Sequence, residues 1–190
     1  MLVGLLGLQG AFLDHVRHLK TLGVGYTVVK EVDTLDAIDC LIIPGGESTV
    51  MEKFMTLFAM TNHLRERIHS GLAVWGICAG CILLARTVDG RPGILGVLPV
   101  DLRRNAYGRQ LESSKRAIDI PAIGKSAFPA LFIRAPRIET VAPQVDVLAE
   151  VGEDPVCVRK DHILATTFHP ELTNDSSFHE YFLNVVSNVP

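Results

Sequence analysis

The fold is decided by a segment in which an apolar strand leads into an apolar helix: Val74-Trp75-Gly76-Ile77-Cys78-Ala79-Gly80-Cys81. Gly-x-Cys-x-Gly at such a junction is the pattern of a nucleophile elbow with Cys in place of Ser. The turn strains the nucleophile's backbone, and Gly76 and Gly80 remove side chains that would collide there. The helix that follows favours the thiolate and directs the Ala79 amide toward a developing oxyanion. We therefore predict a nucleophilic Cys78. An inert buried cysteine and a redox pair with Cys81 are the alternatives.

Around this segment, apolar strands alternate with helical patterns through the first half of the chain. We predict strands at residues 2–6, 26–29, 40–43 and 72–77, and helices around 12–19, 50–58, 64–68 and 81–85. Because the strands are apolar throughout rather than alternating, they are typical of a parallel sheet that helices cover on both faces.

The second half is predicted to add short β segments beside that sheet, at 94–104, 115–120, 130–134, 146–151, 155–160 and 163–168. An amphipathic helix is expected at roughly 176–187, with Phe178, Phe182 and Val185 on one face. The prediction is an α/β fold: a three-layer α/β/α sandwich with a mostly parallel central sheet and a small antiparallel addition. We expect residues 1–190 to form a single domain.

Composition narrows the possible functions. The net charge of −3 gives no reason to expect a nucleic-acid or membrane partner. No apolar stretch approaches the ~18 residues that span a bilayer. Met1 enters its apolar run without a basic region before it, so we expect no signal peptide and a cytoplasmic location. Cys40 and Cys157 are predicted to be core thiols, and a lone Cys-x-x-Cys offers no four-ligand metal site.

A thiol nucleophile requires a base, and His169 is the best candidate. The strand at 163–168 ends in His169-Pro170-Glu171, which places the imidazole at a sheet edge, as for Cys78. Glu171 can hold that imidazole in one tautomer. His162 is placed in a turn. The other five histidines are predicted to be solvated residues on helical surfaces: His15, His18, His63, His69 and His179.

A second glycine-containing turn follows the strand at 40–43: Pro44-Gly45-Gly46-Glu47-Ser48. Its two glycines allow backbone amides to approach a ligand closely. A phosphate site is a poor interpretation because no Lys follows at Walker spacing. A donor to an oxyanion fits better, and a plain turn is the alternative.

Together these motifs resemble the class I, or triad, glutamine amidotransferases. More closely, the chain is similar to the glutaminase subunits of pyridoxal 5′-phosphate synthases. The resemblance covers essentially the whole chain and rests on these segments: Leu6–Gly10, Pro44–Thr49, Cys78–Gly80, Arg104–Gln110, Phe132–Pro136 and Phe168–Thr173. The chain departs from the family at Ile77, where Thr is usual, and at Tyr107, where Phe is common.

The resemblance implies a role for each matching residue. Cys78 would attack the glutamine amide, His169 would move protons and Glu171 would orient His169. The Gly46 and Ala79 amides would form the oxyanion hole. Gln9 would lie near the partner interface. Substrate binding would fall to the following set: Gly45, Gly46, Glu47, Arg104, Ile133 and Arg134.

The implied reaction converts L-glutamine and water to glutamate and ammonia through a thioester. With 190 residues, we expect no room for an ammonia-using domain, so a separate synthase is implied. In this family that synthase is a TIM-barrel protein that makes pyridoxal phosphate. Pyridoxal phosphate is thus the product of the complex and not a cofactor of the present chain. We expect the present chain to need no cofactor and no metal. A Cys-elbow hydrolase or protease of related fold, and a non-catalytic regulatory subunit, are the alternatives.

Overall fold

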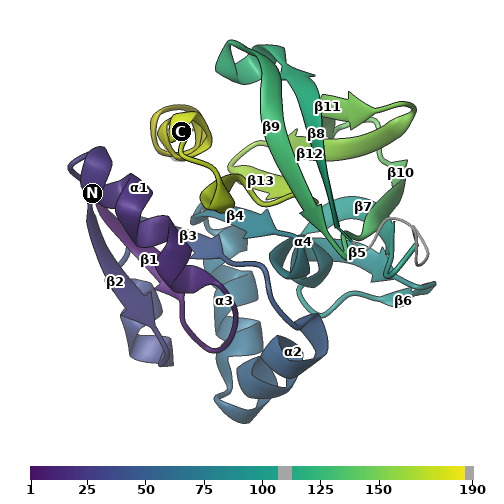
Figure 1. Ribbon diagram of the computed structural model, residues 1–190. Coiled ribbons are helices and arrows are strands. Elements are labelled where there is room, and N and C mark those ends of the chain that lie inside the picture. The colour runs from purple at the N-terminus through teal and green to yellow at the C-terminus, as the bar shows by residue number, and fades with distance from the viewer. Residues whose placement is uncertain (107–112, 187–190) are drawn as a thin grey trace.

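A mostly parallel β-sheet forms the central layer of the molecule in the computed structural model, which describes residues 1–106 and 113–186 (Figure 1). Within these residues the sheet has seven strands in the order β11-β12-β13-β4-β3-β1-β2. Five neighbouring strands pair in parallel: β13 (Ile163–Thr166), β4 (Ala73–Ile77), β3 (Cys40–Ile43), β1 (Leu2–Leu6) and β2 (Gly25–Val29). Two antiparallel strands extend one edge: β12 (Asp154–Lys160) and β11 (Asp146–Val151). The predicted fold class is confirmed.

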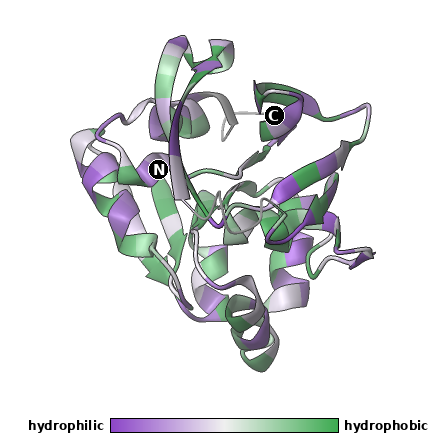
Figure 2. Cartoon of the chain, turned by 45° about the vertical axis from the view of Figure 1, so that its right-hand side comes forward, coloured by the Kyte–Doolittle hydropathy of each residue, from purple (hydrophilic) through white to green (hydrophobic). Residues whose placement is uncertain are grey.

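Alternate side chains of the central strands enter two separate cores. Leu41 and Ile43 of β3 pack with three helices: α2 (Ser48–Leu57), α3 (Met60–His69) and α4 (Ala79–Leu84). Cys40 and Ile42 point to the opposite core, which two other helices cover: α1 (Val16–Thr21) and α5 (Ser177–Tyr181). This alternation is the two-residue period of a strand. Both faces are therefore buried, and the strands stand out as hydrophobic in Figure 2.

Two further sheets surround the edge that β11 and β12 extend. One contains β10 (Arg137–Val141), β7 (Leu98–Arg103), β5 (Ala85–Val88) and β6 (Arg91–Pro92), in that order. The other is a hairpin of β8 (Ser113–Ile120) and β9 (Lys125–Ile133). The β segments predicted for the second half are found, but β5, β6 and β10 were not predicted. The helix expected at 81–85 is part of α4, which ends at Leu84. Strand β5 begins at the next residue, Ala85.

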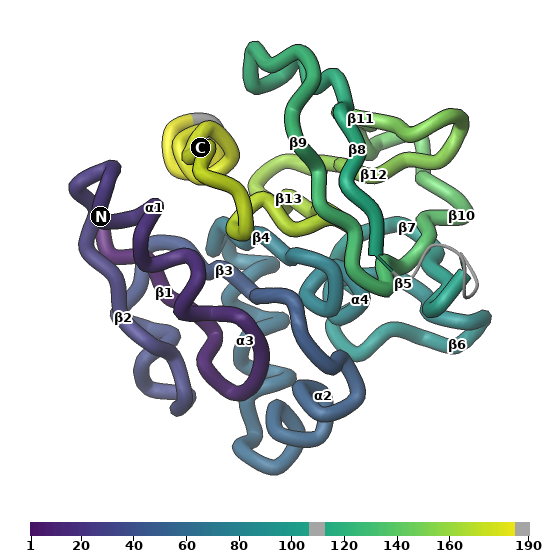
Figure 3. Tube along the Cα trace, viewed as in Figure 1, coloured from purple at the N-terminus to yellow at the C-terminus, as the bar shows by residue number. Residues whose placement is uncertain are grey.

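The N-terminal helical segment and α5 lie side by side. Figure 3 shows the C-terminal helical segment next to α1, over one face of the sheet. The helix predicted at 176–187 is present as α5, followed by a π-helical turn, Phe182–Val186. Phe178 and Phe182 are fully buried in the same core as Trp75, whereas Ser187 lies outside the described residues. None of the helices within 1–106 and 113–186 has the length and apolar character required to cross a bilayer.

The carboxyl ends of four adjacent parallel strands bring the sequence motifs to one edge of the sheet. His169 follows β13, Cys78 follows β4, the Gly45–Gly46 turn follows β3, and Gln9 follows β1. In open α/β sheets this edge is where ligands bind. Strand order therefore assembles the candidate site from segments far apart in sequence.

Candidate active site

Cys78 occupies a strained turn between β4 and α4. Its backbone has φ 49° and ψ −97°, a conformation that non-glycine residues rarely adopt. The turn is tight because the helix start sits directly on the neighbouring strand: a Cβ added to Gly80 would lie 2.2 Å from the carbonyl oxygen of Ile43. Cys78 itself is 7% exposed. The elbow predicted from glycine spacing is thus present, with the sulfur at the edge of the sheet.

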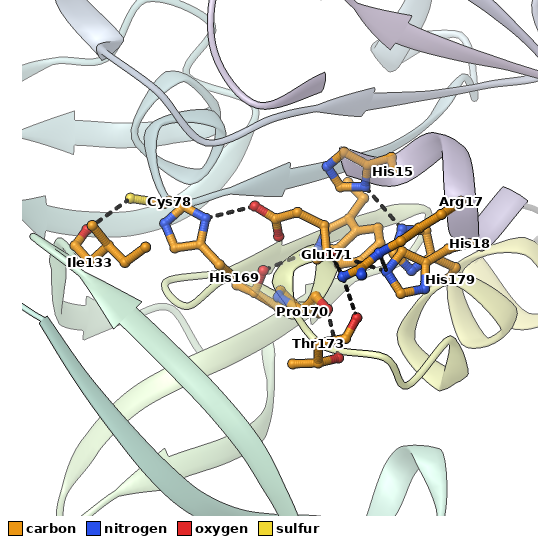
Figure 4. A network of polar contacts seen from close by, with 12 residues as sticks. His15, Arg17, His18, Cys78, Ile133, His169, Pro170, Glu171, Thr173 and His179 are labelled. Carbon is orange, nitrogen blue, oxygen red and sulfur yellow. Dashed lines mark hydrogen bonds and ion pairs between the residues drawn. The ribbon is translucent and has the colours of Figure 1, made fainter. Parts of the chain in front are cut away.

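His169 and Glu171 form a buried pair at the end of the neighbouring strand. Nδ1 of His169 lies 2.7 Å from Oε1 of Glu171, whose side chain has no exposed surface. This bond leaves the other ring nitrogen to act on a reactant. Figure 4 shows the imidazole between the Cys78 sulfur and the Glu171 carboxylate.

The electrostatics of this pair favour a charged imidazole. Burial opposes the charge on His169, but the side chains of Cys78 and Glu171 outweigh burial and raise the pKa of His169 to about 10. In its thiol form, Cys78 donates to the carbonyl oxygen of Ile133 at 3.9 Å. The arrangement can supply a sulfur nucleophile and a proton donor together.

The glycine turn after β3 packs against the histidine. A Cβ on Gly45 would lie 2.3 Å from Cε1 of His169, so only glycine leaves room for the ring. The Gly45 carbonyl accepts a hydrogen bond from Ala11 at 2.9 Å. Because C=O and N–H of a trans peptide point in opposite directions, the Gly46 amide is turned away from Ala11. Gln9 accepts a hydrogen bond from the Glu47 amide at 2.8 Å, which anchors the turn further.

A cavity of about 280 Å³ opens beside the sulfur. It is lined by residues of both glycine turns and of the segments after β7 and β9: Gly46, Glu47, Ser48, Thr49, Cys78, Ala79, Ile82, Arg104, Asn105, Ile133, Arg134 and Pro136. All the proposed substrate-binding residues except Gly45 line it. Five lining residues had not been predicted as site residues: Ser48, Thr49, Ile82, Asn105 and Pro136. All but Ile82 lie in the motif segments quoted above, and nothing in the local pattern distinguishes Ile82 from other residues of α4.

The two arginines of this cavity are held in ion pairs. Arg134, in a left-handed conformation with φ 45°, lies 3.0 Å from Glu47. Arg104 lies 2.7 Å from Asp89. The backbone amide and guanidinium of Arg104 both hydrogen-bond the Asp89 carboxylate and lower its pKa. The Glu47–Arg134 pair therefore presents a negative and a positive group at the same rim. The rest of the arginine motif, 107–110, lies outside the described residues.

Three histidine predictions were wrong. His15, His18 and His179 are not solvated; their exposed fractions are 0%, 2% and 0%. His15 and His18 share a face of the N-terminal helical segment, and that face packs on the C-terminal helix. Of the others, His69 is exposed and His63 pairs with Asp36 at 3.0 Å.

His162 lies in a turn, as predicted, and bonds the Ile68 carbonyl oxygen at 2.8 Å. The four cysteines are unpaired and buried. Burial raises the pKa of the Cys40 thiol to about 12 and also raises those of Cys81 and Cys157. The described part of the chain holds no group of three or more His, Cys, Asp or Glu placed to bind a metal ion.

Comparisons with known proteins give a consistent result. The model of the SNO glutamine amidotransferase family matches residues 5–188. The pyridoxal 5′-phosphate synthase subunit PdxT of Thermotoga sp. strain RQ2 is 49% identical over 187 residues, covering 98% of this chain and 100% of the relative. The PdxT subunit of Desulforamulus reducens is 44% identical over 188 residues, with 98% and 100% coverage.

Solved structures similar to this chain include a glutamine amidotransferase. A crystal structure described as a glutamine amidotransferase is 41% identical, with a TM-score of 0.91 and coverage of 98% of this chain and 99% of the other. The structure of PurLQS from Thermotoga maritima is 16% identical, with a TM-score of 0.67 and coverage of 96% and 97%. The second likeness concerns the fold alone.

Proposed function

Because the chain belongs to the SNO glutamine amidotransferase family, we propose that Cys78, His169 and Glu171 are the catalytic triad of its glutaminase reaction. The enzyme hydrolyses glutamine and supplies ammonia for the synthesis of pyridoxal 5′-phosphate. The observation that carries the residue assignment is the meeting of a strained Cys78 with the buried His169–Glu171 pair at the ends of adjacent strands.

Attack by sulfur begins the proposed reaction. The Cys78 thiolate adds to the amide carbon of the glutamine side chain, and the carbonyl electrons move to oxygen. As the tetrahedral intermediate collapses, the carbon–nitrogen bond breaks and His169 transfers its proton to the leaving ammonia. Neutral His169 then removes a proton from water, which attacks the thioester. Glutamate leaves, and the thiolate and imidazolium are restored.

Two backbone amides are proposed to hold the oxyanion. Ala79 is the first residue of α4, where amides have no intrahelical acceptor. The orientation of the Gly46 amide, away from Ala11, and its position in the cavity with Cys78 and Ala79 support the second donor. Removal of one such donor typically lowers kcat about 10²–10³-fold.

The charged rim of the cavity suits an amino-acid head group. We assign the substrate ammonium to Glu47 and the substrate carboxylate to Arg134, whose present ion pair would be exchanged for two pairs with the zwitterion. Gly45, Gly46 and Ile133 would contact the chain of the substrate, and Arg104 would close the opposite side. Arg104 is the weaker candidate for the carboxylate because Asp89 already engages it.

The ammonia has to reach a synthase subunit. The PdxT relatives are named as subunits of pyridoxal 5′-phosphate synthase, and the present enzyme works with such a synthase. We propose that residues 1–190 serve as one glutaminase domain, that the synthase is a TIM-barrel protein, and that Gln9 lies close to its docking surface. Gln9 lies beside the site, where it accepts a hydrogen bond from the Glu47 amide. A cytoplasmic location also stays a prediction.

The triad is tested by a pair of cysteine variants assayed with the synthase present. Cys78→Ala is expected to abolish glutamate release and covalent labelling by a glutamine-like diazo ketone. Cys81→Ala is the matched control: it removes a buried thiol three positions away and should retain both. Substantial glutamate release by Cys78→Ala would refute the nucleophile, and peptide cleavage by the wild type would favour the protease alternative.

A further inference from the structure

Three buried imidazoles lie behind the proposed triad, and the mechanism above uses none of them. His15 ends a 3₁₀ turn (Phe12–His15), His18 belongs to α1, and His179 belongs to α5. Helical segments from the two halves of the chain, which Figure 3 shows next to each other, thus contribute to one cluster. In Figure 4, Glu171 lies between the His169 ring on one side and these histidines on the other.

The members of this histidine cluster are in mutual contact. Nδ1 of His15 lies 2.9 Å from Nε2 of His179. The rings of His18 and His179 stack at 4.2 Å between centroids, and the Trp75 indole packs edge-on against both His15 and His179. Such packing fixes the planes of the rings and the direction of each ring nitrogen.

The His15–His179 pair is uncharged at neutral pH. Burial lowers the pKa of His15 to about 4, although the nearby charge of Glu171 acts in the opposite direction. Burial lowers the pKa of His179 well below its usual value, and the charges of His15, His18 and Arg17 add to this. In a neutral pair, one imidazole donates and the other accepts, so the tautomers of the two rings are coupled.

Side chains of the N-terminal helical segment also bind the backbone carbonyl of Glu171. The Glu171 carbonyl oxygen accepts a hydrogen bond from Arg17 at 2.6 Å and lies 3.1 Å from Nε2 of His18. Arg17 additionally bonds the Thr173 carbonyl, and Nδ1 of His18 bonds Ser176. Glu171 is therefore held directly against the face of the segment that carries His15.

Three buried polar atoms of this region have no hydrogen-bond partner among the described residues: Oε2 of Glu171, Nε2 of His15 and Nδ1 of His179. Oε1 of the same carboxylate is already bonded to His169. A buried carboxylate requires donors or a favourable dipole to remain ionised. The two atoms are not hydrogen-bonded to each other, so the His15 imidazole can supply a dipole, provided that its Nε2 carries the proton.

We propose that His15 is a positioning residue for the triad, which directs an N–H dipole at the Glu171 carboxylate while His179 fixes the required tautomer. The inference rests on the proposed function. If His179 donates its Nε2 proton to Nδ1 of His15, the His15 proton is on Nε2 and faces the anion. The opposite tautomer would direct a lone pair at the carboxylate, so the negative charge selects the first. The ionised Glu171 then supports the imidazolium of His169.

Two substitutions of His15 separate this role from packing. His15→Phe keeps an aromatic ring and removes the N–H, whereas His15→Gln restores an N–H at similar reach. With the synthase present, we expect His15→Phe to lower kcat about tenfold with KM for glutamine within about twofold. His15→Gln should recover most of kcat.

His162→Phe is the matched control. Like His15, His162 is hydrogen-bonded, although it is half-buried and His15 is fully buried. His162 precedes β13, whereas His169 and Glu171 follow that strand. This variant should lose some thermal stability and keep the wild-type kcat. If His15→Phe behaves like His162→Phe, with a lower Tm alone, the cluster serves only packing and the proposal is overturned.

A measurement on the wild-type protein tests the proposed tautomers without requiring that any variant folds. Long-range ¹⁵N–¹H correlation spectra should show neutral His15 with its proton on Nε2 and His179 with its proton on Nε2. A His15 proton on Nδ1 would overturn the proposal, as would a His15→Gln variant as slow as a folded His15→Phe. Failure of the proposed function would look different: Cys78→Ala would still release glutamate, whatever the His15 variants do.

Discussion

Nδ1 of His169 lies 2.7 Å from Oε1 of Glu171, and this hydrogen bond is buried, with no exposed surface on the Glu171 side chain. A buried carboxylate that bonds one ring nitrogen sets the tautomer of the imidazole and stabilises its positive charge. The rate of the reaction should therefore depend on the charge of Glu171 as well as on its shape.

Replacing Glu171 by Gln tests that dependence. The amide is nearly the same size but neutral, so it cannot stabilise the imidazolium, and its NH₂ can impose the wrong tautomer. We expect kcat to fall roughly 10²–10⁴-fold. KM should change little, because Glu171 does not line the substrate cavity. Steady-state glutamate release with the synthase present measures both, and a kcat within threefold of wild type would contradict the role.

Gly45→Ala tests the contact between the glycine turn and the histidine. The new Cβ would lie 2.3 Å from Cε1 of His169, so the ring or the turn has to move. A displacement near 1 Å can lower the rate by about 10²-fold. The control is Gly71→Ala, at an exposed turn with nothing within 4 Å of the new Cβ, which should affect stability alone. Equal kcat values for the two variants would argue against the tight contact.

The raised pKa of His169 predicts how stability depends on pH. Folding holds this proton more tightly than the unfolded chain, whose His169 titrates near 6.5, and the folded pKa is about 10. The stabilisation is therefore fully present below pH 6.5 and is lost as the pH rises through about 10. Activity should decline over the same alkaline range, since the imidazolium is the proposed proton donor.

Cys78→Ala separates the contribution of His169 to stability from that of other groups that lose protons at alkaline pH. The Cys78 side chain helps to raise the pKa of His169, so its removal should move the alkaline loss of Tm to lower pH. Thermal unfolding between pH 7 and 11 gives the difference between variant and wild type. Superimposable Tm profiles would show that the sulfur and the imidazole are not coupled.

Arg134→Ala tests recognition of the substrate carboxylate. A lost charge-assisted hydrogen bond typically weakens binding by about 1.5–3 kcal/mol, so KM for glutamine should rise roughly 10- to 100-fold. Arg103→Ala is the control, because Arg103 forms a similar exposed ion pair with Glu139, away from the cavity. An unchanged KM for Arg134→Ala would transfer the role to Arg104.

Much of the architecture was predictable because it depends on local pattern. Apolar runs at 40–43 and 72–77 became buried strands, and Gly76 and Gly80 marked the turn that now strains Cys78. Strands β5, β6 and β10 were missed. The pattern before β5 was still helical, β6 has only two residues, and only Ile138 of the five residues of β10 is fully buried.

The sequence alone indicated the candidate catalytic residues, since a glycine-flanked cysteine and a His-Pro-Glu turn are encoded by neighbouring residues. Tertiary structure alone decided which polar side chains are removed from water. His15 and His179 are 164 positions apart, and each has a helical pattern compatible with solvent. Only the docking of the two chain ends against Trp75 and Glu171 buries them, because burial depends on what packs across an element and not on the period within it.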